Sequence, residues 1–372
     1  MKRSFSAVPA IQASQRGLTI VELMIGLLLG VLLLGGVLYV YLGSSQTYRS
    51  TEALSRVQES GRFAMDFLSS DLRQAGYKGV CSRDTEVVSH LNTGGTGYTA
   101  EKFELDEGIR GWNGGNGGYA LTGYRAGSDT LLLKHAAAPA GVSIADDDIP
   151  TSAEEINLTA SSGIPAGQIV LISDSEGCDL FQNSAQSSAS VLARQGGAGE
   201  GTEEEGSGEE GEAEETALEP GNRSGSPLSH DYTGDTDVHL FRSAIYYIGD
   251  GAGGLPALRR LRFDRGAPIG EELVEGIVDM QICYGVDTDQ DSDADNYVAA
   301  GAVADWDEVV AARVTLVAIS PESNVATGAP TVSFADCDGT VLTRDSTHYP
   351  ALGELRLARV FTSTIALRNK LP

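Results

Sequence analysis

The sequence predicts an α+β fold in which a long N-terminal helix packs on a large, mainly antiparallel β-sheet head with long loops. Three observations predict this. Residues 18–42 are almost entirely apolar, an amphipathic helical pattern continues to residue 76, and strand-like runs separated by Gly, Asp and Pro fill residues 77–372. An amphipathic helix must bury its apolar stripe, so a sheet is its expected partner.

The apolar run is long enough to span a membrane. A helix of about 25 residues is roughly 37 Å long, and the hydrocarbon core of a bilayer is about 30 Å thick. Lys2, Arg3 and Arg16 precede the run, whereas the next basic residue is Arg49. The positive-inside rule therefore predicts a single-pass segment with a cytoplasmic N-terminus. The core is too long for an ordinary cleaved signal peptide; a plain signal anchor is the alternative at this point.

One acidic residue, Glu22, lies inside the run. A carboxylate at the bilayer centre costs about 2.5–3.5 kcal/mol on insertion scales, so it needs a partner. Arg16 and Gly17 followed by Glu22, five positions after the glycine, resemble the class III signal of type IV prepilins. The resemblance implies that prepilin peptidase removes the leader, residues 1–17, and methylates the new N-terminal residue. That residue is Leu18, where Phe is commonest in the family, and the leader is longer than in many prepilins.

The same resemblance gives Glu22 a role in filament assembly. Its carboxylate would meet the Leu18 amine of a neighbouring subunit, and such a pair sets register more than it adds net stability. Gly35 and Gly36 form the weak point of the helix, since each mid-helix glycine costs about 0.5–1 kcal/mol relative to alanine. In related filaments a segment near here unwinds. Close packing of helices through small residues is the alternative.

Beyond the membrane run, apolar residues recur at helical spacing and predict one buried stripe: Ala53, Leu54, Val57, Ala64, Phe67, Leu68, Leu72 and Ala75. Gly76 is the expected end of the helix. In the head, alternation predicts two strands with one apolar face each. The first face comprises Val278, Met280, Ile282, Tyr284 and Val286, and the second comprises Val310, Ala312, Val314, Leu316 and Ala318.

Several blocks resemble the PilW family of type IV minor pilins: residues 52–77, 304–306, 309–320 and 360–369. The resemblance implies a minor pilin that enters a type IV pilus and helps initiate its assembly within a tip complex. Its implied partners are prepilin peptidase, other minor and major pilins, the inner-membrane assembly platform and a large tip adhesin. The implied location is the bacterial inner membrane with a periplasmic head, and the pilus surface after assembly, with roles in twitching motility and adhesion.

Charge and composition restrict the function further. The chain has 52 acidic and 26 basic residues, a net charge of −26, which argues against direct nucleic-acid binding. Residues 196–228 contain ten glutamates among many glycines and are expected to be a disordered insertion in an exposed loop.

The four cysteines, Cys81, Cys178, Cys283 and Cys337, all follow the membrane run and so lie on its translocated side, where disulfides form. Three pairings are available. Proximity in sequence favours Cys81–Cys178 and Cys283–Cys337, and one bridge with two free thiols is the alternative.

One loop places carboxylates at every second position: Asp287, Asp289, Asp291, Asp293 and Asp295. The first three match the opening of an EF-hand-type calcium loop. However, Ser292 replaces the usual glycine, and Val298 stands where a bidentate Glu is expected. Calcium binding and an acidic, solvated turn both remain open; no other cofactor is indicated.

No pattern predicts an enzyme. Residues 249–254 fit a dinucleotide-binding glycine pattern, but a second strand rather than a helix follows, which favours a hairpin turn. The histidines lack metal-ligand spacing, and no sequence motif assembles Ser and His into a catalytic group. The alternatives to a minor pilin are a minor pseudopilin of type II secretion and, disfavoured by the charge, a DNA-uptake competence pilin.

Overall fold

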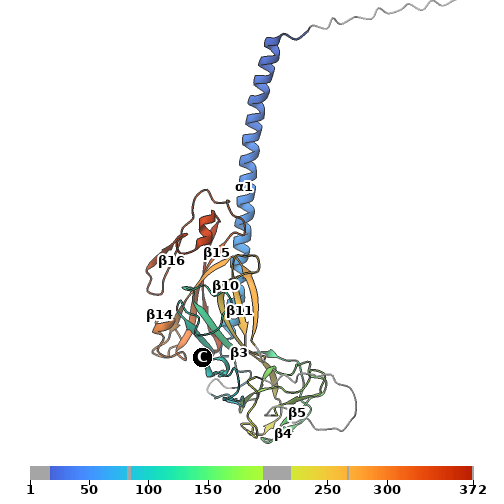
Figure 1. Cartoon of the computed structure of the whole chain (residues 1–372). Coiled ribbons are helices and arrows are strands. Elements are labelled where there is room, and N and C mark those ends of the chain that lie inside the picture. The colour runs from blue at the N-terminus through green and yellow to red at the C-terminus, as the bar shows by residue number, and fades with distance from the viewer. Residues whose placement is uncertain (1–16, 82–84, 196–218, 266–267, 371–372) are drawn as a thin grey trace, which may run out of the picture. The chain divides into compact units, whose positions relative to one another are not determined.

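The computed structural model describes residues 17–81, 85–195, 219–265 and 268–370 (Figure 1). Except for Gly17, the predicted leader lies outside the described residues, as does most of the acidic insertion, 196–218. The chain forms two compact units, Met1–Glu52 and Ala53–Pro372, which are considered separately.

A single long helix, α1 (Ile20–Gln74), begins in the first unit and ends in the second. It ends as predicted, because Gly76 adopts a φ of +74° and the left-handed backbone stops a helix. An 18-residue window near its start is apolar enough, in length and composition, for a membrane span. In the second unit, α1 buries Ala53, Val57, Gly61, Ala64, Leu68 and Leu72. The predicted stripe is confirmed except at Leu54, which is half-buried, and at Phe67, which is 43% exposed.

The largest sheet has eight strands in the order β1-β7-β6-β10-β11-β12, with β3 added to β10 and β2 added to β3. Its strands are β1 (Val88–Ser89), β2 (Ile109–Trp112), β3 (Thr130–Pro139), β6 (Ile169–Ser173), β7 (Cys178–Gln182), β10 (Asp237–Asp250), β11 (Pro256–Arg262) and β12 (Ile269–Glu275). Only the β1–β7 pair is parallel among the described strands. The predicted hairpin at 249–254 is confirmed as the β10–β11 turn.

A second sheet has the order β14-β13-β15-β18. It comprises β13 (Ile277–Val286), β14 (Asn296–Ala299), β15 (Val309–Ile319) and β18 (Ala358–Ala366). Three small two-stranded sheets pair β4 (Asp148–Ile149) with β9 (Tyr232–Thr233), β5 (Glu155–Asn157) with β8 (Val191–Ala193), and β16 (Val332–Ala335) with β17 (Val341–Arg344). Short helical turns complete the head: α2 (Ala100–Phe103), η1 (Ala300–Ala302), η2 (Pro350–Glu354) and η3 (Arg368–Lys370).

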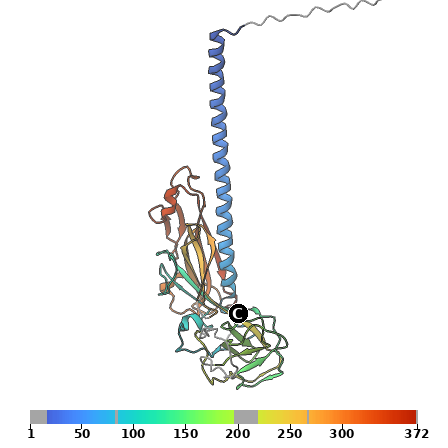
Figure 2. The same cartoon turned by 45° about the vertical axis from the view of Figure 1, so that its right-hand side comes forward.

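The main core lies between α1 and both sheets. Val57, Leu68 and Leu72 of the helix pack with Tyr246 of the larger sheet and Leu316 of the smaller one. Figures 1 and 2 both show this part of α1 alongside the strands. The predicted α+β class, with a helix on a mainly antiparallel sheet head, is therefore confirmed.

Two β-bulges correct the predicted strand faces. The pairing of β13 with β15 shifts between Ile277 and Asp279, so Val278 is an extra residue and joins a separate core cluster on the other face. A second shift, between Gly285 and Val286, leaves Val310 unpaired and puts Val309 in the helix-facing core instead. A bulge inserts one residue and reverses the alternation beyond it, which simple period-two counting misses.

The predicted insertion also extends too far at its C-terminal end. Leu228 is buried in a core cluster, and the side-chain amide of Asn222 donates a hydrogen bond of 2.7 Å to the Gln182 carbonyl. Residues 219–228 are therefore part of the packed head. Glu219 is the only glutamate among them, whereas 196–218 are rich in glutamate. This change in composition was the signal in the sequence that could have marked the end of the insertion.

Candidate assembly segment and head sites

The start of α1 places Glu22 in a local capping arrangement. The Glu22 N–H donates to Thr19 Oγ1 at 3.2 Å, and the Thr19 N–H donates to the Glu22 carboxylate at 3.4 Å. Thr-x-x-Glu is the capping-box pattern, which satisfies amides that the first helical turn leaves without partners. The pattern is visible in the sequence but was not among the predicted features.

The other predicted residues of this segment are in place but lack tertiary contacts. Gly17 and Leu18 precede the helix, and Leu18 is 76% exposed. The helix runs unbroken through Gly35 and Gly36, and a Cβ at either position would meet no atom within 4 Å. Their predicted roles in cleavage, methylation and helix melting stay predictions.

Both favoured disulfides are present. Cys81 is bonded to Cys178 in β7, with Cα atoms 6.1 Å apart, and Cys283 in β13 is bonded to Cys337, with Cα atoms 5.3 Å apart. The first bond ties the segment after α1 to the eight-stranded sheet. The second ties the four-stranded sheet to the turn after β16. Each bond thus fixes a loop to a core strand.

Three of the five loop aspartates converge. Carboxylate oxygens of Asp287, Asp289 and Asp295 lie within 4.8 Å of one another, a spacing that one calcium ion bridges with Ca–O distances of about 2.3–2.6 Å. Asp291 and Asp293 lie outside this group. Repulsion from Asp291 and Asp295 raises the pKa of Asp289.

The loop also closes through its own hydrogen bonds. Asp287 accepts N–H bonds from Gln290 at 2.7 Å and Ser292 at 2.8 Å. Ser292 takes a φ of +76°, the conformation for which calcium loops use glycine. Calorimetry separates the two interpretations: heat with millimolar calcium that disappears in Asp289→Asn identifies a calcium loop, and no heat identifies an acidic turn.

The structure assembles a Ser–His–Asp group that no sequence motif predicted. Ser229 Oγ lies 2.9 Å from His230 Nδ1, and His230 Nε2 lies 3.0 Å from the Asp174 carboxylate. The three residue types are those of a serine-hydrolase triad, but the ring nitrogens are exchanged, because in the hydrolases Nε2 faces the serine and Nδ1 faces the aspartate. Ser229 and His230 are adjacent in the chain, whereas Asp174 comes from the turn after β6, so only the fold brings all three together.

A fourth residue shows why this group does not form a nucleophile and its base. The hydroxyl of Ser229 lies 2.5 Å from Asp179, which also accepts hydrogen bonds from the Ser229 N–H, His90 and Tyr232. Burial alone would raise the pKa of Asp179, but these hydrogen bonds hold it below its usual range. An ionised carboxylate only accepts, so the single Ser229 proton goes to Asp179. With this proton directed to Asp179, Ser229 has none to give to His230, so His230 does not act as its base.

This network therefore fastens the chain after the acidic insertion to the sheet. Asp179 belongs to β7, His90 follows β1, and Ser229 and Tyr232 belong to the returning segment. Asp179 and His90 are fully buried. A buried carboxylate with several donors is stable only while all of them remain in place.

A second buried aspartate joins the two large sheets. Asp129, just before β3, accepts N–H bonds of 2.7 Å from both Gly114 and Ile282, and its own N–H donates to the Met280 carbonyl at 2.8 Å. Burial raises its pKa to about 7, although the two N–H bonds lower it. Asp129 is thus a titratable connection between the sheets in the neutral range.

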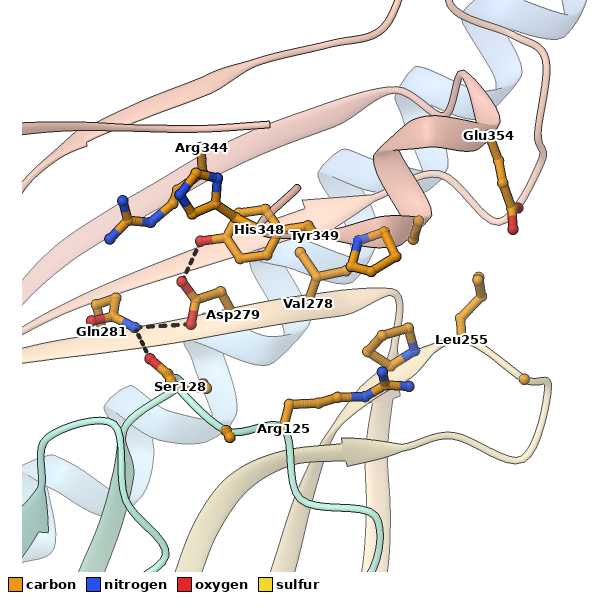
Figure 3. Close-up of a pocket in the computed structure, with 16 residues that line it drawn as sticks. Arg125, Ser128, Leu255, Val278, Asp279, Gln281, Arg344, His348, Tyr349 and Glu354 are labelled. Carbon is orange, nitrogen blue, oxygen red and sulfur yellow. Dashed lines mark hydrogen bonds between the residues drawn. The ribbon is translucent and has the colours of Figure 1, made fainter. Parts of the chain in front are cut away.

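Next to this connection lies a cleft of about 670 Å³ (Figure 3). Its walls come from the 125–128 loop, the β10–β11 turn, β13, β17 and the segment 348–354. On its floor, Asp279 accepts a hydrogen bond from the hydroxyl of Tyr349 and another, of 2.9 Å, from Gln281. Burial raises the pKa of Asp279 despite these hydrogen bonds. A cleft with a few buried polar groups is a candidate binding site.

Comparison with known protein families finds a match over part of the chain. The model of the family described as Type IV Pilus-assembly protein W (PilW) matches residues 245–369. No curated protein matches the chain, and no solved structure does. The matched residues run from within β10 to η3 and include the whole four-stranded sheet. The resemblance to PilW is thereby confirmed over this segment, and the match supports a type IV pilus-associated protein.

Proposed function

From this PilW-type segment and the N-terminal signal, we propose that the chain is a minor pilin that is processed by prepilin peptidase and incorporated into a type IV pilus. It helps initiate assembly within a minor-pilin complex at the tip. The observation that carries the proposal is one chain with both features: a PilW match at residues 245–369 and an apolar helix preceded by Gly17 and Leu18. The role is structural and needs no catalysis.

The proposed assembly step uses the start of α1. Cleavage after Gly17 leaves an amine on Leu18, one residue before the cap at Thr19. The Thr19–Glu22 amide contact of 3.4 Å is longer than an ordinary N–H···O bond of about 2.7–3.2 Å. The carboxylate therefore keeps most of its capacity to accept from the amine of a neighbouring subunit, where a charged hydrogen bond in lipid is strong.

The proposed location follows from the same helix. The N-terminus is cytoplasmic, the helix spans the inner membrane, and the head is periplasmic before assembly and on the pilus afterwards. The partners are prepilin peptidase, other minor and major pilins, the inner-membrane platform and a large tip adhesin. Both disulfides suit an oxidising compartment.

Deleting the gene tests the proposal against its first rival, a minor pseudopilin of type II secretion. We expect loss of surface pili and twitching with normal secretion, restored by the wild-type gene. Loss of secretion with normal pili would instead identify a pseudopilin. A competence pilin would bind DNA in a salt-dependent manner, which the acidic chain disfavours.

A further inference from the structure

The cleft in Figure 3 is lined by two arginines and a histidine, Arg125, Arg344 and His348, in a chain with twice as many acids as bases. Its acidic lining residues are Asp279 and Glu354, and Glu354 pairs with Arg356 at 2.6 Å. Arg125 pairs with the exposed Asp250 at 2.7 Å, and His348 contacts Asp345 of its own turn at 3.0 Å. Among the described residues, Arg344 has no ion-pair partner; its guanidinium is hydrogen-bonded to the hydroxyl of Tyr349. A guanidinium has five N–H donors, so it can also receive an anionic group.

The bulge in β13 shapes the floor of the cleft. Because Val278 is the extra residue, Val278 and Asp279 both turn away from the core that holds Ile277 and Met280. An apolar side chain and a carboxyl group thus line the cleft next to each other. Bulges near functional sites re-aim side chains in this way.

The polar groups of the floor already have partners. Asp279 is bonded to Tyr349 and Gln281, and Ser128 Oγ accepts the Met280 N–H at 3.0 Å. These bonds leave the floor with little capacity to bind the hydroxyls of a sugar. Polar recognition of a ligand is therefore left to the arginines at the sides of the cleft, and above all to Arg344.

The remaining wall is apolar. The cleft is lined here by Leu255 of the β10–β11 turn, Pro256 at the start of β11, Pro350 and Ala351 of η2, and Val278. Figure 3 shows Val278 and Leu255 on one side of Asp279, with Arg344 on the other. Sugar hydroxyls placed against this wall would lose hydrogen bonds to water without replacement, which costs free energy. Aliphatic or aromatic side chains would gain by burial there.

We infer that the cleft binds an extended acidic peptide segment of a partner protein. A carboxylate of the segment pairs with Arg344, and a neighbouring apolar side chain lies against Val278, Leu255 and Pro350. Charge provides the selection, because an Arg–carboxylate pair is directional and strong, whereas the rest of this acidic surface repels such a segment. The inference concerns the head alone and holds whether or not the chain enters a pilus.

Fluorescence anisotropy tests it with the full chain in detergent. The probes are labelled hexapeptides combining Glu with Leu, Phe or Pro, and matched peptides carrying Gln in place of Glu. We expect at least one Glu peptide to bind, its Gln counterpart to bind about tenfold more weakly, and binding to weaken as salt increases. Arg344→Gln should cause a similar loss, and Arg344→Lys should restore part of it.

Arg359→Gln is the matched control, since Arg359 is exposed on β18 outside the cleft. Thermal unfolding of each variant shows that the head remains folded. The inference is overturned by equal binding of the Glu and Gln peptides, by full binding to folded Arg344→Gln, or by no binding of any peptide at millimolar concentration. It is also overturned if N-acetylneuraminic acid competes better than the peptides, because the ligand is then an acidic sugar.

Discussion

Glu22 combines two roles in one side chain, and substitution separates them. Gln also completes a capping box but carries no charge. We therefore expect Glu22→Gln to keep the start of α1 and to abolish incorporation into filaments as completely as Glu22→Ala. Immunoblotting of sheared pili and of membranes measures incorporation and insertion.

Thr19→Ala is the control for the cap. It removes the cap hydroxyl at a cost of about 1 kcal/mol and leaves the charge of Glu22 intact. It should therefore still enter filaments. Normal incorporation of Glu22→Gln would mean that the carboxylate charge is not needed.

Asp129 predicts a dependence of stability on pH. Its carboxyl titrates near pH 7 in the folded head but near its ordinary value of 3.8 when unfolded, so the folded state binds more protons between about pH 4 and 7. Its contribution to the free energy of unfolding therefore decreases as pH rises through this window, by about 1.4 kcal/mol per pH unit. Asp129→Asn cannot titrate and should show a less negative slope of unfolding free energy against pH.

Urea unfolding of the full chain in detergent at pH 5, 6, 7 and 8 measures this slope. Asp305→Asn, at an exposed position, is the control and should follow the wild type. Identical slopes for Asp129→Asn and the wild type would contradict the assignment of this titration to Asp129.

The residues that the sequence predicts to be functional are those whose proposed roles depend on near neighbours in the chain. Gly17, Leu18 and Glu22 lie within six positions, and Gly76 ends a helix through its own backbone conformation. The buried aspartates were not predicted, because their partners are remote: Asp129 binds Ile282, 153 residues away. In sequence, each such aspartate looks like any loop carboxylate.

At the scale of elements, the contact of α1 with β18 has no spare room. Gly61 is buried in the helix, and a Cβ there would overlap the ring of Phe361. Although Ala is the better helix former, we expect Gly61→Ala to destabilise the head by about 1–3 kcal/mol through overpacking. Thermal or urea unfolding measures the loss.

Phe361→Leu tests whether this overlap is the cause. The double variant, Gly61→Ala with Phe361→Leu, should lose less unfolding free energy than the two single variants lose together, because the smaller side chain makes room for the new methyl group. Additive losses, or a stabilising Gly61→Ala, would show that the helix and β18 can move apart without cost.

Elements were predicted well in kind and less well in detail. The long helix and the antiparallel strands follow from periodicity, which reports burial on one face. The bulges at Val278 and Val310 were missed because a bulge depends on the partner strand, and pairing partners are not written in the sequence of either strand.

At the scale of the whole molecule, the residues on either side of the acidic insertion are held together. Arg194 donates a hydrogen bond of 2.5 Å to the Ser226 carbonyl, and Gln182 donates one of 2.9 Å to the Glu219 carbonyl. Replacing residues 196–218 by a short Gly-Ser linker should therefore leave the melting temperature nearly unchanged. Each halving of the length of a loop changes the free-energy cost of closing it by only about 0.6 kcal/mol.

Arg194→Ala in the same background is the counterpart. It removes hydrogen bonds to both Ala153 and Ser226 and should lower the melting temperature clearly. A large loss of stability on replacing 196–218 alone would mean that this segment contributes to the packed head.

The central claim is that this chain is a processed pilin subunit, and the mass of its mature N-terminus tests it most directly. We predict a mature protein that begins with N-methylated Leu18 when a prepilin peptidase is present, and an uncut chain when Gly17 is replaced by a larger residue. A mature protein that begins at Met1, or at any residue other than Leu18, would contradict the account.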